Sequence, residues 1–185
     1  MNAQVDNDQG SLLLQIARAS IASRFGLWFD CRDDADFLYE QRACFVTLSL
    51  SGQLRGCIGS LQAHRPLLDD VKENAQAAAF RDPRFQPLSA NEYTETTIEI
   101  SLLSPLSPME VEDEQDALSQ LQPGVDGVVL HCGSKRGTFL PQVWESLPDP
   151  QQFLAELKRK AGLSTEYWSD DVRLFRYHVD KWTEG

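Results

Sequence analysis

Apolar residues recur every three to four positions in three stretches of the chain. The first, SLLLQIARASIASRF at 11–25, places an apolar stripe along a helix, and Gly26 follows as a C-terminal stop. The second, PLLDDVKENAQAAAF at 66–80, begins with a proline suited to a first helical turn and carries acidic residues near the positive end of the helix dipole. The third, QQFLAELKRKAG at 151–162, follows the capping residue Asp149. These stretches predict three helices.

Two apolar runs separated by a turn predict a hairpin. ACFVTLSL at 43–50 and QLRGCIG at 53–59 are joined by Ser51 and Gly52, a pair suited to the positive φ of a tight turn. Successive side chains on a regular strand point to opposite faces. If the second strand is regular, one face carries Leu54, Gly56 and Ile58, and the other carries Arg55, Cys57 and Gly59.

Further strands are predicted after the second helix. TTIEISLLS at 96–104 alternates, GVVLHC at 127–132 and GTFL at 137–140 flank a turn, and VRLFRYHV at 172–179 closes the chain. The stretch at 104–115, with its prolines and acids, marks a connection and the expected position of a lobe boundary. Hairpins with helices between them predict an α+β fold with a mainly antiparallel sheet flanked by helices.

Short helical segments are expected at two further places. LSANEY offers Ser89 as a cap with Glu92 three residues on, the spacing of a capping box. DALSQL, beyond the acidic connection, also suits a short helix. The segment PQVWESLPDP lacks clear periodicity and is expected to be a loop.

Composition and charge narrow the class of protein. The chain has 185 residues, 42% of them hydrophobic, which is enough for one sizeable core. No stretch approaches the roughly 20 consecutive apolar residues of a membrane span, and the first ten residues are polar and acidic, so a cytoplasmic protein is expected. The net charge of -11 disfavours binding to nucleic acid and to anionic lipid. Four cysteines without a C-x-x-C pair are expected to be reduced thiols.

Several motifs of this chain occur together, and in this order, in one known family. They are FVTLSLSGQLRGCIGSL at 45–61, RPLLDDVKENAQAAAFRDPRF at 65–85, IEISLLSP at 98–105, DGVVL at 126–130 and TFLPQVWESLPDPQQFL at 138–154. The chain resembles the AMMECR domain family, the A component of the AmmeMemoRadiSam system. The LRGCIG and FLPQVWE segments are the most specific part of the resemblance.

The resemblance covers residues 10–182 and leaves 1–9 as a flexible N-terminus. It implies one domain in which a larger part, built from both chain ends, carries a smaller inserted part, with a cleft between them. It assigns no reaction and no cofactor, because the family's biochemical role is unsettled. It names two kinds of partner: a Memo-type protein similar to non-haem-iron extradiol dioxygenases, and a radical S-adenosylmethionine protein.

Cys57 within LRGCIG is the first candidate for chemistry. A neighbouring Arg55 would favour the thiolate, and Gly56 and Gly59 would let a ligand approach the backbone closely. The alternative is structural, because free cysteine is often buried and strand glycines often mark a bulge or tight packing. Both interpretations remain open.

Two further motifs could border a binding site. In RDPRF, Arg81 and Arg84 flank Asp82 and could bind an anion or a carboxylate, or the three could form a structural ion-pair network. In LPQVWE, Gln142, Trp144 and Glu145 could line a cleft, and Trp144 could equally anchor an irregular segment to the core.

A metal site is not predicted. The candidates would be Cys57, His64, His131 and Cys132, but adjacent residues of a strand point to opposite faces, so His131 and Cys132 do not easily bind the same ion. His178 is expected to be a surface or packed residue. Nor does the chain contain a phosphate-binding glycine loop, G-x-S-x-G or H-E-x-x-H.

Two functions from different classes follow. The first is a binding or adaptor module whose cleft, edged by Arg55, Arg81, Arg84 and Trp144, engages a partner protein or a small anionic ligand. The second is an enzyme that works beside the Memo-type and radical proteins, with Cys57 as nucleophile and Glu145 as acid or base. The first is favoured, because no complete set of nucleophile, base and orienting group is evident.

Overall fold

The chain forms two compact units. The computed structural model describes residues 3–31 and 33–185. The first unit contains the residues up to Leu103 together with Asp180–Gly185, and the second consists of Ser104–Val179. The boundary at Leu103 directly precedes the stretch at 104–115, where the sequence predicts a connection.

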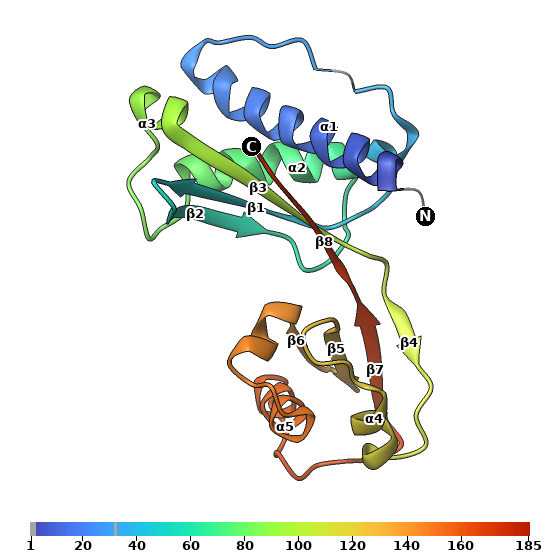
Figure 1. Ribbon diagram of the computed structural model, residues 1–185. Coiled ribbons are helices and arrows are strands. Elements are labelled where there is room, and N and C mark those ends of the chain that lie inside the picture. Colours follow the sequence, from blue (N-terminus) through green and yellow to red (C-terminus); the bar gives the residue numbers. More distant parts are fainter. Residues whose placement is uncertain (1–2, 32) are drawn as a thin grey trace. The chain divides into compact units, whose positions relative to one another are not determined.

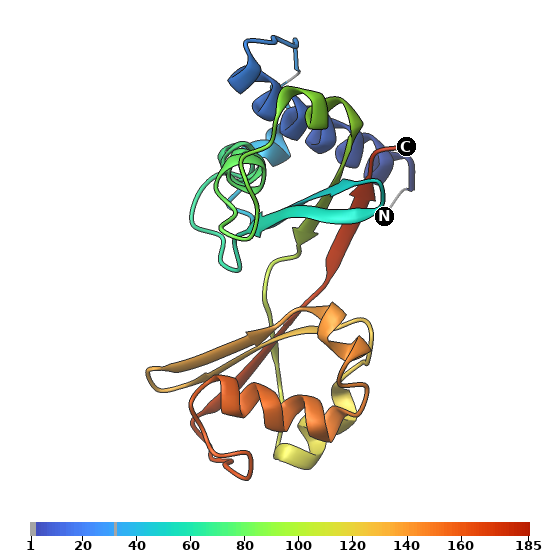
Figure 2. The ribbon, with the colours of Figure 1, turned by 90° about the vertical axis from the view of Figure 1, so that its left-hand side faces the viewer.

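In the first unit, one antiparallel sheet packs against two long helices. The strand order is β2-β1-β3-β8, and α1 and α2 lie on the same face of the sheet (Figures 1 and 2). The helices and strands are α1 (Ala3–Ala22), β1 (Cys44–Leu50), β2 (Gln53–Gly59), α2 (Leu67–Phe80), α3 (Ala90–Glu95), β3 (Thr96–Leu103) and β8 (Val179–Thr183).

Both long helices of this unit lie where the apolar stripes predict them. Gly26 ends the first helical segment in the left-handed conformation, with φ of 74°. The start of α1 differs from expectation, because the helix begins at Ala3, within the stretch expected to be flexible, while residues 1–2 lie outside the described part of the chain. The core between helices and sheet is formed by fully buried residues of α1, β1, α2 and β3, including Leu13, Ile21, Val46, Leu48, Leu67, Val71, Ile98 and Ile100.

The predicted hairpin is formed, but its second strand is not regular. Ser51 and Gly52 both adopt positive φ, of 51° and 76°. Leu48 pairs with Gly56, whereas Ser49 pairs with Leu54, so Arg55 is the extra residue of a β-bulge. Because of this extra residue, the side chain of Leu54 points to the opposite face of the sheet from the one that a regular strand would give it.

Because of the bulge, the predicted faces of β2 are partly wrong. Leu54 lies on the same face as Cys57, since Thr47 and Ser49 are their partners on β1. Gly56 faces α2. No described helix of this unit lies on the Cys57 side of the sheet (Figures 1 and 2). We call this side the helix-free face; its members include Phe45, Thr47, Ser49, Leu54, Cys57 and Glu99.

The second unit also has an antiparallel sheet, in the order β4-β7-β5-β6, with α5 against it (Figures 1 and 2). Its elements are β4 (Ser107–Met109), α4 (Glu114–Gln120), β5 (Gly127–Cys132), β6 (Lys135–Phe139), a 3-10 helix at Pro141–Glu145, α5 (Pro150–Lys160) and β7 (Val172–Tyr177). Its separate core contains Val128, Leu130, Phe153, Leu157 and Leu174, each at most 1% exposed.

The strands at the unit boundary differ most from the prediction. The last predicted strand, at 172–179, corresponds to β7, which ends at Tyr177, and after His178 the chain continues as the unpredicted β8 in the other sheet. Part of the predicted connection at 104–115 forms β4, which pairs with β7. The prediction missed both because a three-residue strand and a change of sheet leave no periodic signal in the sequence.

Candidate functional site

Cys57 lies on the helix-free face, opposite Thr47 of β1. The Thr47 hydroxyl donates a hydrogen bond to the Cys57 Sγ over 3.3 Å, and the thiol-bearing residue is partly buried. Arg55, which the sequence predicts as a neighbour on this face, is instead the bulge residue. The thiol and the guanidinium are therefore directed to different partners.

The backbone of Cys57 is held from the outer side of β2. Its N–H donates to Asp82 Oδ2 over 2.9 Å, and its carbonyl accepts from Arg84 Nη2 over 3.2 Å. Arg84 also donates to both carboxylate oxygens of Asp82, over 3.0 and 2.7 Å. These hydrogen bonds outweigh the effect of burial and hold the pKa of the Asp82 carboxyl well below its ordinary value.

This contact matters because β2 is an edge strand of the sheet. An edge strand presents free N–H and C=O groups to which another strand can pair. At Cys57 both groups are occupied by Asp82 and Arg84, which follow α2 directly. We call this arrangement the Asp82–Arg84 clamp. It protects the edge and fixes the backbone that carries the thiol.

Arg55 has its own carboxylate partner. Its Nε lies 2.8 Å from Glu92 Oε1, and its Nη2 donates to the carbonyl of Gln86 over 2.9 Å. Glu92 also completes the predicted capping box with Ser89. The hydrogen bond from Arg55 is the largest cause that lowers the pKa of Glu92, to about 2. The charge of Arg55 is thus compensated within the first unit.

Arg81 pairs with a different carboxylate from those of Arg55 and Arg84. Its Nη2 contacts Glu73 of α2 at 2.5 Å, and both side chains are about half exposed. Within RDPRF, the structure pairs Asp82 with Arg84, whereas Arg81 pairs with Glu73 and is not part of the network of three expected for the structural alternative.

The two glycines of LRGCIG are packed against the protein itself. A Cβ atom on Gly56 would lie 2.2 Å from the carbonyl oxygen of Ala78 in α2, and one on Gly59 would lie 2.2 Å from the Phe45 ring. Both contacts are far closer than any side chain tolerates. The glycines allow α2 and Phe45 to approach β2 closely, and this packing fills the space beside them.

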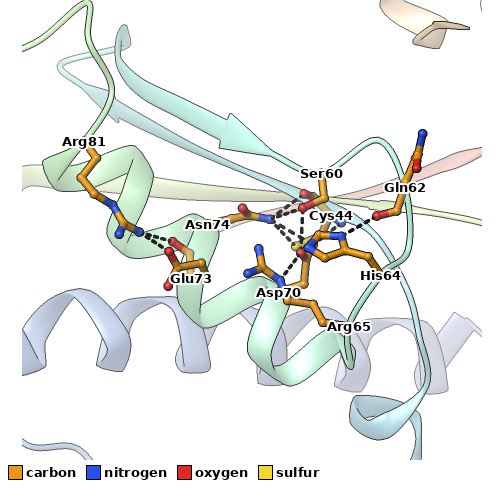
Figure 3. Close-up of polar contacts among 9 residues, drawn as sticks. All are labelled: Cys44, Ser60, Gln62, His64, Arg65, Asp70, Glu73, Asn74 and Arg81. Atoms are coloured by element: carbon orange, nitrogen blue, oxygen red, sulfur yellow. Dashed lines mark hydrogen bonds and ion pairs between the residues drawn. The ribbon is translucent and has the colours of Figure 1, made fainter.

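A second buried carboxylate, Asp70, holds the beginning of β1 and the end of β2 (Figure 3). It is fully buried, and its oxygens accept hydrogen bonds from Cys44 N–H, Ser60 Oγ, Arg65 Nε and Asn74 Nδ2, over 2.7 to 3.0 Å. Figure 3 shows these residues gathered around Asp70, and it shows Arg81 reaching back to Glu73 on α2.

Asn74 completes the same network. Its side-chain amide also donates to the carbonyl of Cys44 over 3.0 Å. Burial raises the pKa of the Cys44 thiol well above its ordinary value, and the nearby carboxylate of Asp70 adds to this shift. Cys44 is therefore held as a neutral thiol inside the first core.

Burial of Asp70 and Asn74 is not among the sequence predictions, in which Asp70 is only an acid near the positive end of the helix dipole. One signal was available: Asp70 and Asn74 lie three and seven positions after Leu67, so they fall on the apolar stripe of α2. A polar residue on such a stripe indicates a buried hydrogen-bonding group.

The remaining candidate residues belong to the second unit. Trp144 is buried, stacks on Phe153 with 3.7 Å between ring centroids, and donates its indole N–H to the carbonyl of Asp126 over 2.7 Å. Gln142 and Glu145, on the same 3-10 helix, are exposed. Trp144 thus anchors this segment to the core of the second unit, while Gln142 and Glu145 remain accessible.

The metal-ligating residue types are dispersed. Within residues 3–31 and 33–185, no group of three or more His, Cys, Asp or Glu side chains has a metal-binding arrangement. His64 is exposed and contacts the carbonyl of Gln62. His131 packs against the Phe175 ring, and burial lowers its pKa. His178, which was expected to be a surface or packed residue, is half exposed.

Across the described helices, none has the length and apolar character needed to cross a membrane.

The comparisons with known proteins agree with this architecture. The AMMECR1 family model matches residues 14–182, nearly the whole chain. The chain belongs to the AMMECR1 family. This membership confirms the resemblance carried by LRGCIG and FLPQVWE, and the two antiparallel sheets with flanking helices confirm the predicted α+β fold.

Archaeal relatives of this AMMECR1 family member match over most of their length. A protein of Methanothermobacter thermautotrophicus is 36% identical over 96% of this chain and 95% of its own. One of Methanocaldococcus jannaschii is 32% identical, over 96% and 90%. The crystal structure of an uncharacterized protein from Pyrococcus horikoshii is similar with a TM-score of 0.75 and 30% identity, covering 96% of this chain and 92% of that one.

Proposed function

We propose that this AMMECR1 family member is a cytoplasmic binding or adaptor module, and that the helix-free face around Cys57 is where it engages its partner. The observation that carries the proposal is the Asp82–Arg84 clamp, which fixes the Cys57 backbone through 2.9 and 3.2 Å hydrogen bonds. A fixed surface loses little conformational entropy on binding, which favours recognition.

The thiol itself supports binding more than catalysis. Its side-chain contact is the Thr47 hydroxyl, which is a hydrogen-bond donor here and not a base. A cysteine nucleophile needs a neighbouring base or a charge that stabilises the thiolate. Arg55, the group proposed for that role from the sequence, is paired with Glu92.

Of the two ligand classes, the geometry favours a partner protein over a small anion. Arg55, Arg81 and Arg84 each contact a carboxylate of this chain, so an anion would have to compete with an existing ion pair. The helix-free face also carries Leu54, which is 47% exposed. An exposed leucine beside polar groups is typical of a surface that contacts another protein.

The Memo-type and radical S-adenosylmethionine proteins are the proposed partners, and purified examples test the proposal directly. Isothermal titration should detect binding of at least one to the wild-type chain. Leu54→Arg should weaken it by at least about tenfold, because a charge would be buried at the contact. Leu106→Arg is the matched control, since Leu106 is 44% exposed but belongs to the second unit. Wild-type chain that binds neither partner, or Leu54→Arg that binds as wild type, contradicts the proposal.

Covalent labelling of Cys57 distinguishes the enzyme alternative from a module that only binds. If Cys57 is a nucleophile supported by Glu145, Cys57→Ser and Glu145→Gln should each abolish covalent labelling by an activated thioester while partner binding persists. If the module only binds, both variants should keep binding, and Glu145→Gln should not change the rate of Cys57 labelling.

A further inference from the structure

A buried carboxylate with an unused oxygen lies at the start of β5. Asp126 is fully buried, and its Oδ2 accepts a hydrogen bond from the Gln122 N–H over 2.9 Å. Its Oδ1 is buried without a hydrogen-bond partner, and no other carboxylate in the described part of the chain has such an oxygen. An unpaired buried carboxylate oxygen is costly, so this one requires an explanation.

The imidazole of His178 is placed to supply the missing partner. Its Nδ1 lies 4.0 Å from Asp126 Oδ1, too far for a hydrogen bond but within reach of a ring rotation. The backbone of His178 is fixed on both sides, because its N–H donates to Ser104 Oγ and its carbonyl accepts from Ser104 N–H, each over 2.9 Å. Only the side chain therefore has to move.

The other charged group beside Asp126 is Arg176. Its Nη1 lies 3.9 Å from Asp126 Oδ2, and its Nη2 donates to the carbonyl of Gln120 over 3.4 Å. Arg176 thus faces the Oδ2 side of the carboxylate, which leaves Oδ1 to the imidazole. The His178 side chain is 54% exposed, so the ring edge opposite Nδ1 can reach solvent.

We propose that Asp126 and His178 form a carboxylate–imidazole dyad that accepts a proton from a small molecule with a weakly acidic O–H or N–H group. Asp126 Oδ1 accepts the Nδ1–H hydrogen bond, which keeps the lone pair on Nε2. Nε2 takes the proton from the ligand, the carboxylate stabilises the imidazolium, and the half-exposed ring returns the proton to water. The dyad lies entirely in the second unit and does not depend on the proposed binding face.

Histidine tautomers give a direct test, since the chain has only three histidines. In the full-length protein labelled with ¹⁵N-histidine, neutral His178 should be protonated on Nδ1. Asp126→Asn should shift it to the Nε2–H form by about tenfold or more in population, the scale of a hydrogen bond to a charged group. His64, whose Nδ1 contacts the neutral carbonyl of Gln62, is the internal reference and should not change.

Acylation by diethyl pyrocarbonate is the second readout. The free Nε2 of His178 should react about tenfold faster in the wild type than in Asp126→Asn, whereas Asp171→Asn, an exposed aspartate of the same unit, should have no effect. If Asp126→Asn does not fold, the wild-type tautomer decides alone. A wild-type His178 in the Nε2–H form, or equal His178 tautomers and rates in the wild type and in folded Asp126→Asn, overturns the dyad.

Discussion

Both units contain buried aspartates beside strands, but the two units differ in how many of the carboxylate oxygens accept hydrogen bonds. In the first unit, Asp70 and Asp82 are surrounded by donors, and every carboxylate oxygen accepts at least one hydrogen bond. In the second unit, Asp126 uses one oxygen and leaves the other unpaired. Full saturation indicates a group that holds structure, and an unused oxygen indicates a group that can still respond to a proton or a ligand.

The same comparison explains why the first unit keeps Cys57 in place. Asp70 and Asp82 lie near the beginning and just beyond the end of α2, and each accepts a backbone N–H from a strand, of Cys44 and of Cys57. One helix therefore fixes two strands through its two ends. In the second unit, the buried carboxylate of Asp126 accepts a backbone N–H from Gln122, which lies in the turn before β5 and not in a strand.

The largest effect is expected for Asp70→Ala. Removing this carboxylate leaves Arg65, Asn74, Ser60 and the Cys44 N–H without their acceptor inside or at the edge of the core. The free energy of unfolding should fall by about 3–5 kcal/mol, measured by urea denaturation. A loss below about 1 kcal/mol would show that water replaces the network.

The sharpest form of the comparison is a matched pair, Asp82→Asn and Asp126→Asn. Both carboxylate oxygens of Asp82 accept hydrogen bonds from N–H groups. In Asp82→Asn the amide NH₂ would therefore face an N–H donor, and the free energy of unfolding should fall by about 2–3 kcal/mol. Asp126→Asn can turn its NH₂ toward the unpaired side and keep the Gln122 hydrogen bond, so it should cost below about 1 kcal/mol. Equal losses of stability would remove the distinction between the two regions.

Acid should weaken the first unit through Asp82 and Glu92. The pKa of each is lowered in the folded state, so each contributes stability that is complete above the unfolded value and lost as the pH falls through the folded value. For Glu92 the window runs from 4.5 down to about 2. Between pH 6 and pH 2, the midpoint temperature of thermal unfolding should fall less steeply in Glu92→Gln than in the wild type. Glu95→Gln changes an exposed residue and should follow the wild-type curve.

The smallest effect is expected for Arg81→Ala. Its ion pair with Glu73 joins two half-exposed side chains, so its removal should change the free energy of unfolding by less than about 0.5 kcal/mol. Arg84→Ala is the informative contrast, because it also breaks the contact with the Cys57 carbonyl. A large loss for Arg81→Ala would indicate a role for this arginine beyond its visible ion pair.

Much of the fold was predictable because its signals are local. The stripes of α1, α2 and α5, the Ser51-Gly52 turn and the Ser89 capping box each depend on residues within a few positions. The bulge at Arg55 was not predictable, because it inserts one residue without changing the apolar pattern around it. β8 was missed for a similar reason, since it follows β7 after a single residue, His178, and no turn signal marks the change of sheet.

For the candidate site, the sequence by itself determined the motif, the family and the residue types at hand: a thiol, paired glycines, and arginines beside carboxylates. Only the tertiary structure decided how they pair. Arg55 turns to Glu92, 37 positions away, and Asp82 reaches Cys57 across 25 positions. Hydrogen bonds over such separations depend on how helices pack on strands, and that packing also determines which carboxylates are saturated and that Asp126 is not.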